Sequence, residues 1–270
     1  MVVKTFIPAF AHLTLLCVLA GSVPAGVLAA WSTPGEGFSG ELTLGGPVTS
    51  SRNPWSWKLM PGETDMSLRT ADRASRAGEQ VWSGLLKARP VLMGKTTQST
   101  PAGREGLAPV VNYGSGMPDS VLTWLSGGEA EVTLPVYDSV SPGVQAGHFR
   151  FRLRAAMLLR YTQGDQPVYA GIYNDLPGNG LPPEGKTLPA AQLAAELCGQ
   201  FAGEGPSWLC GGGLGVTTSL PLSRLTDDRL HQLQGVYGVE TVAGSGELVL
   251  REGAMPAHWK TTLNVSIAYQ

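Results

Sequence analysis

The stretch Thr262-Leu263-Asn264-Val265-Ser266-Ile267-Ala268-Tyr269-Gln270 alternates apolar and polar residues without interruption. Because successive side chains of a β-strand point to opposite faces of a sheet, a period of two predicts a strand with one apolar face. That face carries Leu263, Val265, Ile267 and Tyr269. We therefore expect a C-terminal strand that packs one side against a hydrophobic core.

A second alternating stretch lies near the other end of the chain. Its apolar or small members on one face are Phe38, Gly40, Leu42, Leu44, Gly46 and Val48. Pro47 has no backbone N–H, which favours an edge strand over a central one. Alternating strands at both ends of a chain suit strand donation, in which one molecule supplies a strand to the open sheet edge of another. The pattern equally allows both strands to pair within one closed sandwich.

The composition between these ends favours an all-β protein. The 270 residues include 36 glycines and 20 prolines, whereas charged residues make up 15% and hydrophobic residues 43%. Such a chain can bury a core, and its many turn-forming residues are typical of short strands joined by loops. The formal net charge of −2 shows no basic excess, which argues against a nucleic-acid partner.

Residues 1–30 have the pattern of a secretory signal peptide. Lys4 supplies a positive charge, residues 13–23 are apolar, and Ala29 and Ala30 are small residues that suit signal peptidase. We expect cleavage after one of these two alanines and export of the mature chain through the periplasm.

Export decides how the cysteines are interpreted. Cys17 is removed with the signal peptide, so Cys198 and Cys210 remain in an oxidising compartment. Two cysteines allow one pairing, and we predict a disulfide between them. A metal pair is the alternative, but no histidine lies near in sequence and the spacing matches no zinc pattern.

Further elements are predicted from local pattern. Strands are expected at residues 55–59, 90–94, 132–137, 149–153, 236–242 and 247–251. One helix is expected at residues 189–197, with Gly199 placed to end it. A second helix is expected from Thr226 to Gly235, because Thr226 can cap it and Asp227 and Asp228 suit its positive first turn.

Several segments carry a family resemblance. They are Trp31 with Phe38-Ser39-Gly40, Leu44-Gly45-Gly46, Trp55-Ser56-Trp57-Lys58, Pro90-Val91-Leu92-Met93-Gly94-Lys95-Thr96, Leu222-Ser223-Arg224 and residues 259–269. In this order they resemble segments of the subunits of chaperone/usher fimbriae, of the thin, flexible type whose major subunit is the adhesin. The likeness spans nearly the whole mature chain except residues 160–215. The cysteine pair there departs from the major-subunit pattern, so the chain looks like a minor subunit of this Fae-like family.

The resemblance implies an incomplete immunoglobulin-like sandwich that lacks its last strand. Residues 31–49 would be an N-terminal donor strand, and residues 50–270 would form the sandwich, with an inserted subdomain of short helices at about residues 160–215. A periplasmic chaperone would pair with the C-terminal strand, an outer-membrane usher would export the subunit, and a neighbouring fimbrial subunit would then supply its donor strand. Gly40 or Gly46 would face a shallow part of the groove. The implied function is a structural subunit of a surface fimbria that contributes to host-cell adhesion.

No pattern typical of an enzyme stands out. Residues 35–40 match G-x-G-x-x-G, yet a dinucleotide site needs a strand before the motif and a helix after it. The histidines of the mature chain have no metal-binding spacing, and no G-x-S-x-G motif occurs. We expect a protein without enzymatic activity, cofactor or metal ion.

The alternative function is a carbohydrate-binding adhesin that recognises host glycoconjugates through the middle of the chain. Arg150 and Arg152 share one strand face, and guanidinium groups suit the carboxylate or sulfate of an anionic glycan. Tyr169, Tyr173 and Trp208 are candidates for stacking on sugar rings. Each has an ordinary explanation too, because arginine stripes are typical of solvated strand faces and aromatic side chains are typical of cores.

Overall fold

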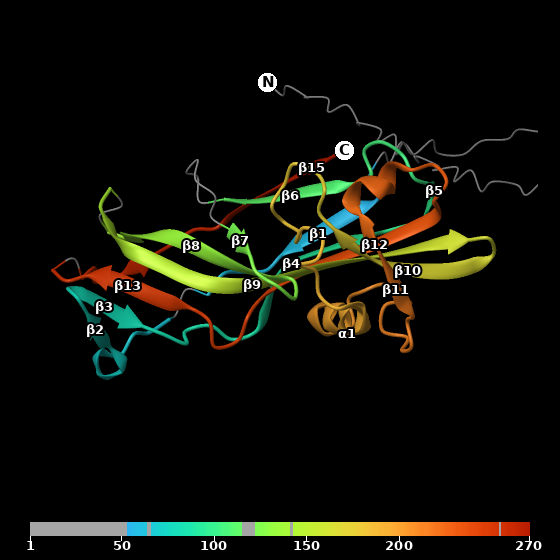
Figure 1. Cartoon of the computed structure of the whole chain (residues 1–270). Helices are drawn as coiled ribbons and strands as arrows, with labels where there is room; N and C mark the ends of the chain where they lie inside the picture. Colours follow the sequence, from blue (N-terminus) through green and yellow to red (C-terminus); the bar gives the residue numbers. More distant parts are fainter. Residues whose placement is uncertain (1–52, 64–65, 115–121, 141–142, 254) are drawn as a thin grey trace, which may run out of the picture. The chain divides into compact units, whose positions relative to one another are not determined.

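The computed structural model describes residues 53–63, 66–114, 122–140, 143–253 and 255–270, which belong to one compact unit (Figure 1). Its strands are β1 (Trp55–Leu59), β2 (Ala74–Arg76), β3 (Glu79–Trp82), β4 (Arg89–Thr96), β5 (Thr100–Ala102), β6 (Pro109–Gly114), β7 (Leu122–Trp124), β8 (Glu129–Asp138), β9 (Gln145–Gln163), β10 (Gln166–Tyr173), β11 (Val216–Pro221), β12 (His231–Thr241), β13 (Glu247–Arg251), β14 (Trp259–Lys260) and β15 (Asn264–Tyr269). The described helices are α1 (Ala190–Phe201) and the 3-10 helices η1 (Thr70–Asp72) and η2 (Leu222–Thr226).

The large sheet is organised around β9, which is 19 residues long. One edge of β9 pairs with β13 and then with β12, and the other edge pairs with β8 and then with β10, all antiparallel. The sheet continues outward from β12 to β4 and β1, and from β13 to β3 and β2. β9 therefore links the two halves of the sheet.

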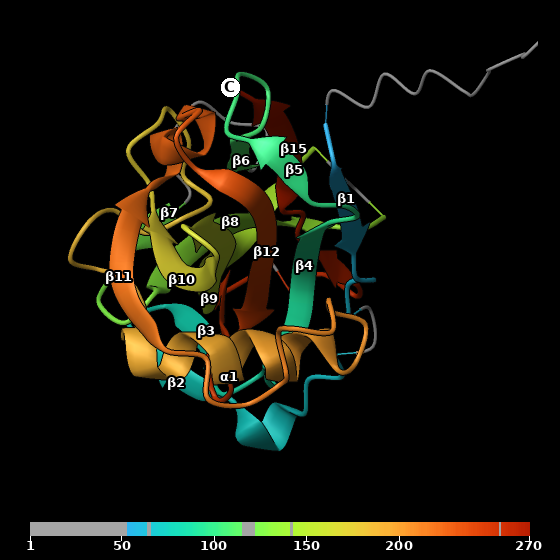
Figure 2. The ribbon, with the colours of Figure 1, turned by 90° about the vertical axis from the view of Figure 1, so that its right-hand side faces the viewer.

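The two faces of β9 have different neighbours. One face contributes the following residues to the main hydrophobic core: Phe149, Phe151, Leu153, Ala155, Met157, Leu159 and Tyr161. The other face begins with Arg150, Arg152 and Arg154 and continues with the buried Ala156 and Leu158, which pack with α1 in a second hydrophobic cluster. Figure 2 shows α1 lying across this second face of the sheet. The helix therefore turns part of a solvated strand face into a second core.

The main core is covered on its other side by a separate two-stranded sheet, β6 and β15. Val111 and Tyr113 from β6 are buried in the core, and Val265 and Ile267 from β15 pack against it. Figure 2 shows these two strands on the side of the large sheet opposite α1. The described unit is therefore a sandwich-like all-β fold with one α-helix, as the sequence predicts.

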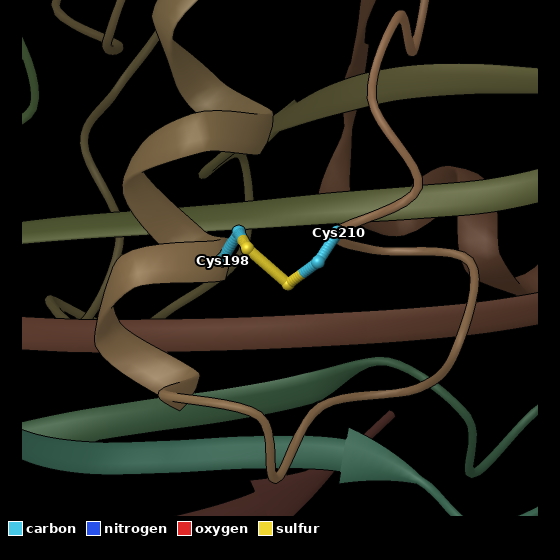
Figure 3. Close-up of a disulfide and its surroundings, with 2 residues drawn as sticks. All are labelled: Cys198 and Cys210. Atoms are coloured by element: carbon cyan, nitrogen blue, oxygen red, sulfur yellow. A yellow bond between two sulfur atoms is a disulfide. The ribbon is translucent and has the colours of Figure 1, made fainter.

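The chain between β10 and β11 crosses over the sheet through α1, because β10 and β11 pair in parallel. A disulfide joins Cys198 in α1 to Cys210 in the following loop, with 5.3 Å between the Cα atoms (Figure 3). The predicted cysteine pairing is confirmed. No helix of the described residues is long and apolar enough to cross a membrane.

Most of the predicted strands are present, but the helix predicted from Thr226 to Gly235 is wrong. Thr226 ends η2, and its hydroxyl donates to the carbonyl of Ser223 instead of capping a helix. The carboxylate of Asp227 accepts the backbone N–H of Arg229, which makes a tight turn into β12. Thr, Asp and Asn favour turns as well as helix starts, so these signals were ambiguous.

The end of the predicted helix at residues 189–197 also needs correction. Gly199 lies inside α1, which continues to Phe201 and ends where Ala202 adopts a left-handed conformation with φ of 45°. Leu193, Leu197 and Phe201 are buried on one side of the helix. This burial at a spacing of four residues extends the helix past the glycine.

Candidate functional site

One edge of β15 has no strand partner among the described residues. The backbones of Gln270 and Ala108 exchange two hydrogen bonds of 3.0 Å, which places the bonded pairs of the β6–β15 ladder at every second residue from Gln270. In an antiparallel pair the residues between such pairs point their N–H and C=O groups away from the partner. Those residues are Val265, Ile267 and Tyr269.

The side chains of the same three residues face the core but only half cover it. Val265, Ile267 and Tyr269 are each half-buried, while Asn264, Ser266, Ala268 and Gln270 are exposed. β15 thus presents unpaired backbone groups and incompletely buried apolar side chains from the same residues. An added strand would form hydrogen bonds with these backbone groups and would also cover the apolar side chains.

The other edge of the β6–β15 sheet is already covered. Asn179, in the loop after β10, pairs through its side-chain amide with both backbone groups of Tyr113, at 2.7 and 2.8 Å. The backbone N–H of Gly180 donates to the carbonyl of Val111 at 2.9 Å. The open edge of this small sheet is therefore that of β15.

β1 presents a matching open edge. The hydrogen bonds Met60 N to Val91 O and Thr97 N to Pro54 O place the bonded pairs of the β1–β4 ladder at even-numbered residues of β1. The backbone groups of Trp55, Trp57 and Leu59 therefore point away from β4. The side chain of Leu59, on the same face as the two tryptophans, is 63% exposed. Leu59 is therefore an uncovered apolar side chain beside an open strand edge.

Side chains join the two open edges at one end. The indole Nε1 of Trp57 donates to the hydroxyl of Tyr269 at 2.8 Å. The Trp57 ring also stacks on Trp55 and meets Tyr237 edge-on, with both centroid distances 5.4 Å. Burial raises the pKa of the Tyr237 hydroxyl well above its usual value, and this hydroxyl donates to the carbonyl of Gly180. This end of the site has an aromatic, uncharged floor.

The opposite end opens into a cavity of about 640 Å³. One wall comes from the segment after β1, including Met66 and Leu68, and the other comes from the segment that leads to β15, including Trp259. Phe149 and Leu250 of the main core also line it. Because the cavity lies where the chain leaves β1 and where it approaches β15, we treat the cavity and the two open edges as one candidate site, which we call the acceptor groove.

The other predicted site residues do not gather in one place. Tyr169 and Trp208 lie together, with ring centroids 5.8 Å apart, and both pack against the cluster beneath α1. Tyr173 lies at the far end of β10. Arg152 is eight residues along β9 from Arg160, the cross-strand partner of Tyr169, a separation of about 26 Å. Arg150 lies two residues farther away, and the guanidinium of Arg152 binds Glu129 at 2.9 Å.

The predicted donor strand, Phe38 to Val48, lies outside the described residues. Sequence reasoning found the alternation in β15 and in β1 but missed that these strands flank one groove. It also missed Met66, Leu68 and Leu250 as lining residues, because no local pattern marks them. Among the described residues no group of His, Cys, Asp and Glu side chains is arranged to hold a metal ion.

An exported, disulfide-bonded sandwich with an open apolar strand edge is the kind of protein from which surface fibres are built. A family model described as "Fimbrial, major and minor subunit", of the K88 type, matches residues 11–270. The chain is 48% identical over 257 residues to the K88 minor fimbrial subunit FaeI of Escherichia coli, covering 95% of this chain and 98% of that protein. The chain belongs to the K88 family of fimbrial subunits, which confirms the resemblance seen in the sequence.

Membership of this family has direct consequences. The chain is a structural fimbrial subunit, it is exported to the fimbria at the cell surface, and it associates with other fimbrial subunits. The family is structural and not a family of enzymes.

Proposed function

We propose that this subunit polymerises by donor-strand exchange through the acceptor groove. The strand at residues 38–48 of a neighbouring subunit lies between β1 and β15 in the fibre. Before assembly a periplasmic chaperone pairs with Leu263, Val265, Ile267 and Tyr269, and an outer-membrane usher exchanges it for the donor strand. The observation that carries this proposal is that the unpaired backbone groups and half-buried side chains of β15 belong to the same residues.

The energetics favour an occupied groove. The N–H and C=O groups of Val265, Ile267 and Tyr269 can form hydrogen bonds with an added strand, each worth about 0.5–1.5 kcal/mol net. An alternating donor places side chains such as Leu42 and Leu44 over the uncovered core, at about 25 cal/mol per Å² of buried apolar surface. One glycine of the donor, Gly40 or Gly46, would lie over the aromatic floor, where a side chain would clash.

The acceptor edge is tested by a pair of substitutions on adjacent residues of β15. Ile267→Asp puts a charge on the core face, whereas Ser266→Asp puts the same charge on the exposed face. In cells that make either variant as the sole copy, we expect Ser266→Asp to be incorporated into fimbriae and Ile267→Asp to be absent from them, as measured by immunogold labelling. Equal labelling by both variants would refute the acceptor role.

The donor strand is tested separately, without altering the folded sandwich. A synthetic peptide of residues 36–50 added to the purified mature chain should raise its melting temperature, and the same peptide with Leu42→Asp and Leu44→Asp should not. Deleting residues 31–49 should confine the subunit to a terminal position in the fibre. If the truncated subunit is found along the shaft, the donor assignment is wrong.

A carbohydrate-binding role is a second candidate, and residues 160–215 are the proposed insert that carries it. Tyr169 and Trp208 are both half-buried, with their ring planes tilted by 43°, and the indole Nε1 of Trp208 is itself buried without an acceptor among the described residues. The exposed part of this aromatic pair could stack on a sugar ring. Saturable glycan-array binding that is lost in Trp208→Ala would support this role in adhesion, and absence of any binding would exclude it.

A further inference from the structure

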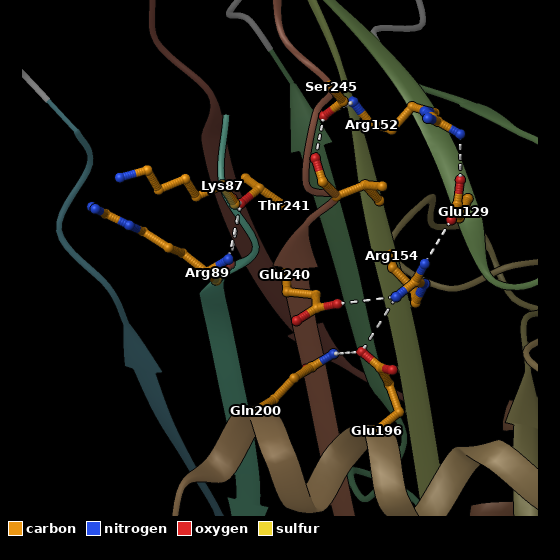
Figure 4. Close-up of polar contacts among 11 residues, drawn as sticks. Lys87, Arg89, Glu129, Arg152, Arg154, Glu196, Gln200, Glu240, Thr241 and Ser245 are labelled. Carbon is orange, nitrogen blue, oxygen red and sulfur yellow. Dashed lines mark hydrogen bonds and ion pairs between the residues drawn. The ribbon is translucent and has the colours of Figure 1, made fainter. Parts of the chain in front are cut away.

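Arg154 of β9 lies among three carboxylates that come from three different elements (Figure 4). Its guanidinium is 2.8 Å from Glu129 of β8, 3.2 Å from Glu240 of β12 and 3.6 Å from Glu196 of α1. The side chains of these four residues are between 13% and 26% exposed. This cluster is the place where charged groups of the helix meet those of the sheet.

The cluster has fewer hydrogen-bond donors than acceptors. The carboxylate of Glu129 also binds the guanidinium of Arg152 at 2.9 Å, so it has two arginine partners. Glu196 and Glu240, in contrast, share one guanidinium nitrogen of Arg154. Gln200 of α1 donates to Glu196 at 3.3 Å, and the buried side-chain carbonyl oxygen of Gln200 has no donor among the described residues. A proton kept on one of the two carboxyls relieves this shortage.

Glu240 is the carboxyl that keeps the proton. Burial, followed by the hydrogen bond and charge of Glu196, raises the pKa of Glu240 to about 7. Burial acts in the same direction on Glu196, but hydrogen bonds with Glu240 and Gln200 and the charge of Arg154 outweigh it and lower the pKa of Glu196. Below about pH 7 the two carboxyls therefore form one acid and one carboxylate.

We propose that a proton shared between Glu240 and Glu196 fastens α1 to the sheet, and that losing this proton loosens the helix. With both carboxyls ionised, one guanidinium nitrogen faces two like charges across the helix–sheet interface. The apolar contacts of Leu193, Leu197 and Phe201 remain, so the helix loosens without leaving the sheet. Because α1 also carries the disulfide to the loop of Trp208, the proton controls how firmly this surface is held.

Other charges near Glu240 do not compensate for it. Its cross-strand neighbour on β4 is Pro90, and the adjacent Arg89 binds Glu63 at 3.5 Å. Figure 4 shows Arg89 and Lys87 extending away from the cluster. The groups that face Glu240 are therefore Arg154 from β9 and Glu196 and Gln200 from α1. Glu129 of β8 binds Arg154 and Arg152.

The direction of the pH effect follows from proton binding. When α1 is detached, Glu240 titrates near its ordinary value of 4.5, whereas in the docked state it titrates at about 7. The docked state thus holds more protons between these two values, so docking is firmest at the acidic end and weakens as the pH rises to about 7. Above that value both states are ionised and the effect levels off.

Hydrogen exchange followed by mass spectrometry on the purified mature chain tests the proposal. After correction for the intrinsic exchange rate, we expect amide protection in α1 to fall about tenfold between pH 5 and pH 8, a figure reduced for partial exposure of the cluster. Protection in β9 should stay constant. Glu240→Gln and Glu196→Gln should each abolish the dependence, whereas the remote, exposed Glu105→Gln should keep it.

Three results would overturn the proposal. The first is a constant protection of α1 across this pH range in the unaltered chain. The second is an equal loss in α1 and β9, which would indicate global unfolding. The third is a dependence that persists in both glutamine variants, which would assign it to a histidine. Using two variants guards against a folding defect in either one.

Discussion

Gly238 of β12 lies directly beneath α1, and replacing it with alanine is the sharpest test of how the helix packs. A Cβ atom at this position would overlap the side-chain carbonyl oxygen of Gln200 and would lie 2.8 Å from a methyl group of Leu197. Gln200 is 3% exposed, so its side chain has little room to move aside. The helix must therefore shift outward by about 1 Å, because contacts below about 3.4 Å are repulsive.

The cost of this shift has two parts. Overpacking a well-packed core by one methyl group costs about 1–3 kcal/mol. Displacing Gln200 also weakens its hydrogen bond to Glu196, worth about 1 kcal/mol. We expect Gly238→Ala to lower the free energy of unfolding by about 3 kcal/mol in urea titrations followed by circular dichroism.

Gly199 provides the matched control with the opposite sign. It lies inside α1, is exposed, and has no atom within 4 Å of the position that an added methyl group would occupy. Alanine there should raise the free energy of unfolding by up to about 1 kcal/mol, because glycine is the poorer helix former. A neutral Gly238→Ala variant, or a destabilised Gly199→Ala variant, would refute this account of the packing.

Two further predictions concern single contacts. Trp57→Phe and Tyr269→Phe each remove one partner of the hydrogen bond between the Trp57 indole and the Tyr269 hydroxyl. A double-mutant cycle on the free energy of unfolding should give a coupling energy of about 1 kcal/mol. If the effects of the two substitutions are additive, the hydrogen bond contributes nothing to stability. Replacing Cys198 and Cys210 with serine opens a 12-residue loop and should lower the free energy of unfolding by about 3 kcal/mol, whereas an unchanged urea midpoint would contradict this estimate.

The sequence was sufficient to predict a strand when one face of that strand contacts the core and the other face contacts solvent. The alternation at residues 55–59 and 263–269 corresponds to β1 and β15, and the pair Cys198 and Cys210 left one choice of disulfide. These features depend on local pattern alone. The family resemblance rests on the same local segments.

The sequence was insufficient where a distant element changes the environment of a strand. Only residues 149–153 of β9 were predicted, because the alternation is lost at Ala155 to Leu159, where α1 covers the second face. The acceptor groove depends on which backbone groups of β1 and β15 point outward, and that follows from pairing with β4 and β6. Glu196 and Glu240 gave no signal, since 44 residues separate them in the sequence.

The open edge of β15 makes the thermodynamic stability of this chain depend on its surroundings. A strand that binds the folded sandwich but not the unfolded chain adds RT ln(1 + [L]/Kd) to the free energy of unfolding, about 2.7 kcal/mol at a hundred times Kd. In the proposed donor-strand exchange the donor belongs to an adjacent subunit of the fibre, so its local concentration would be high and would not fall on dilution. The isolated subunit and the assembled subunit would then have different free energies of unfolding. A melting temperature measured on one of them would not describe the other.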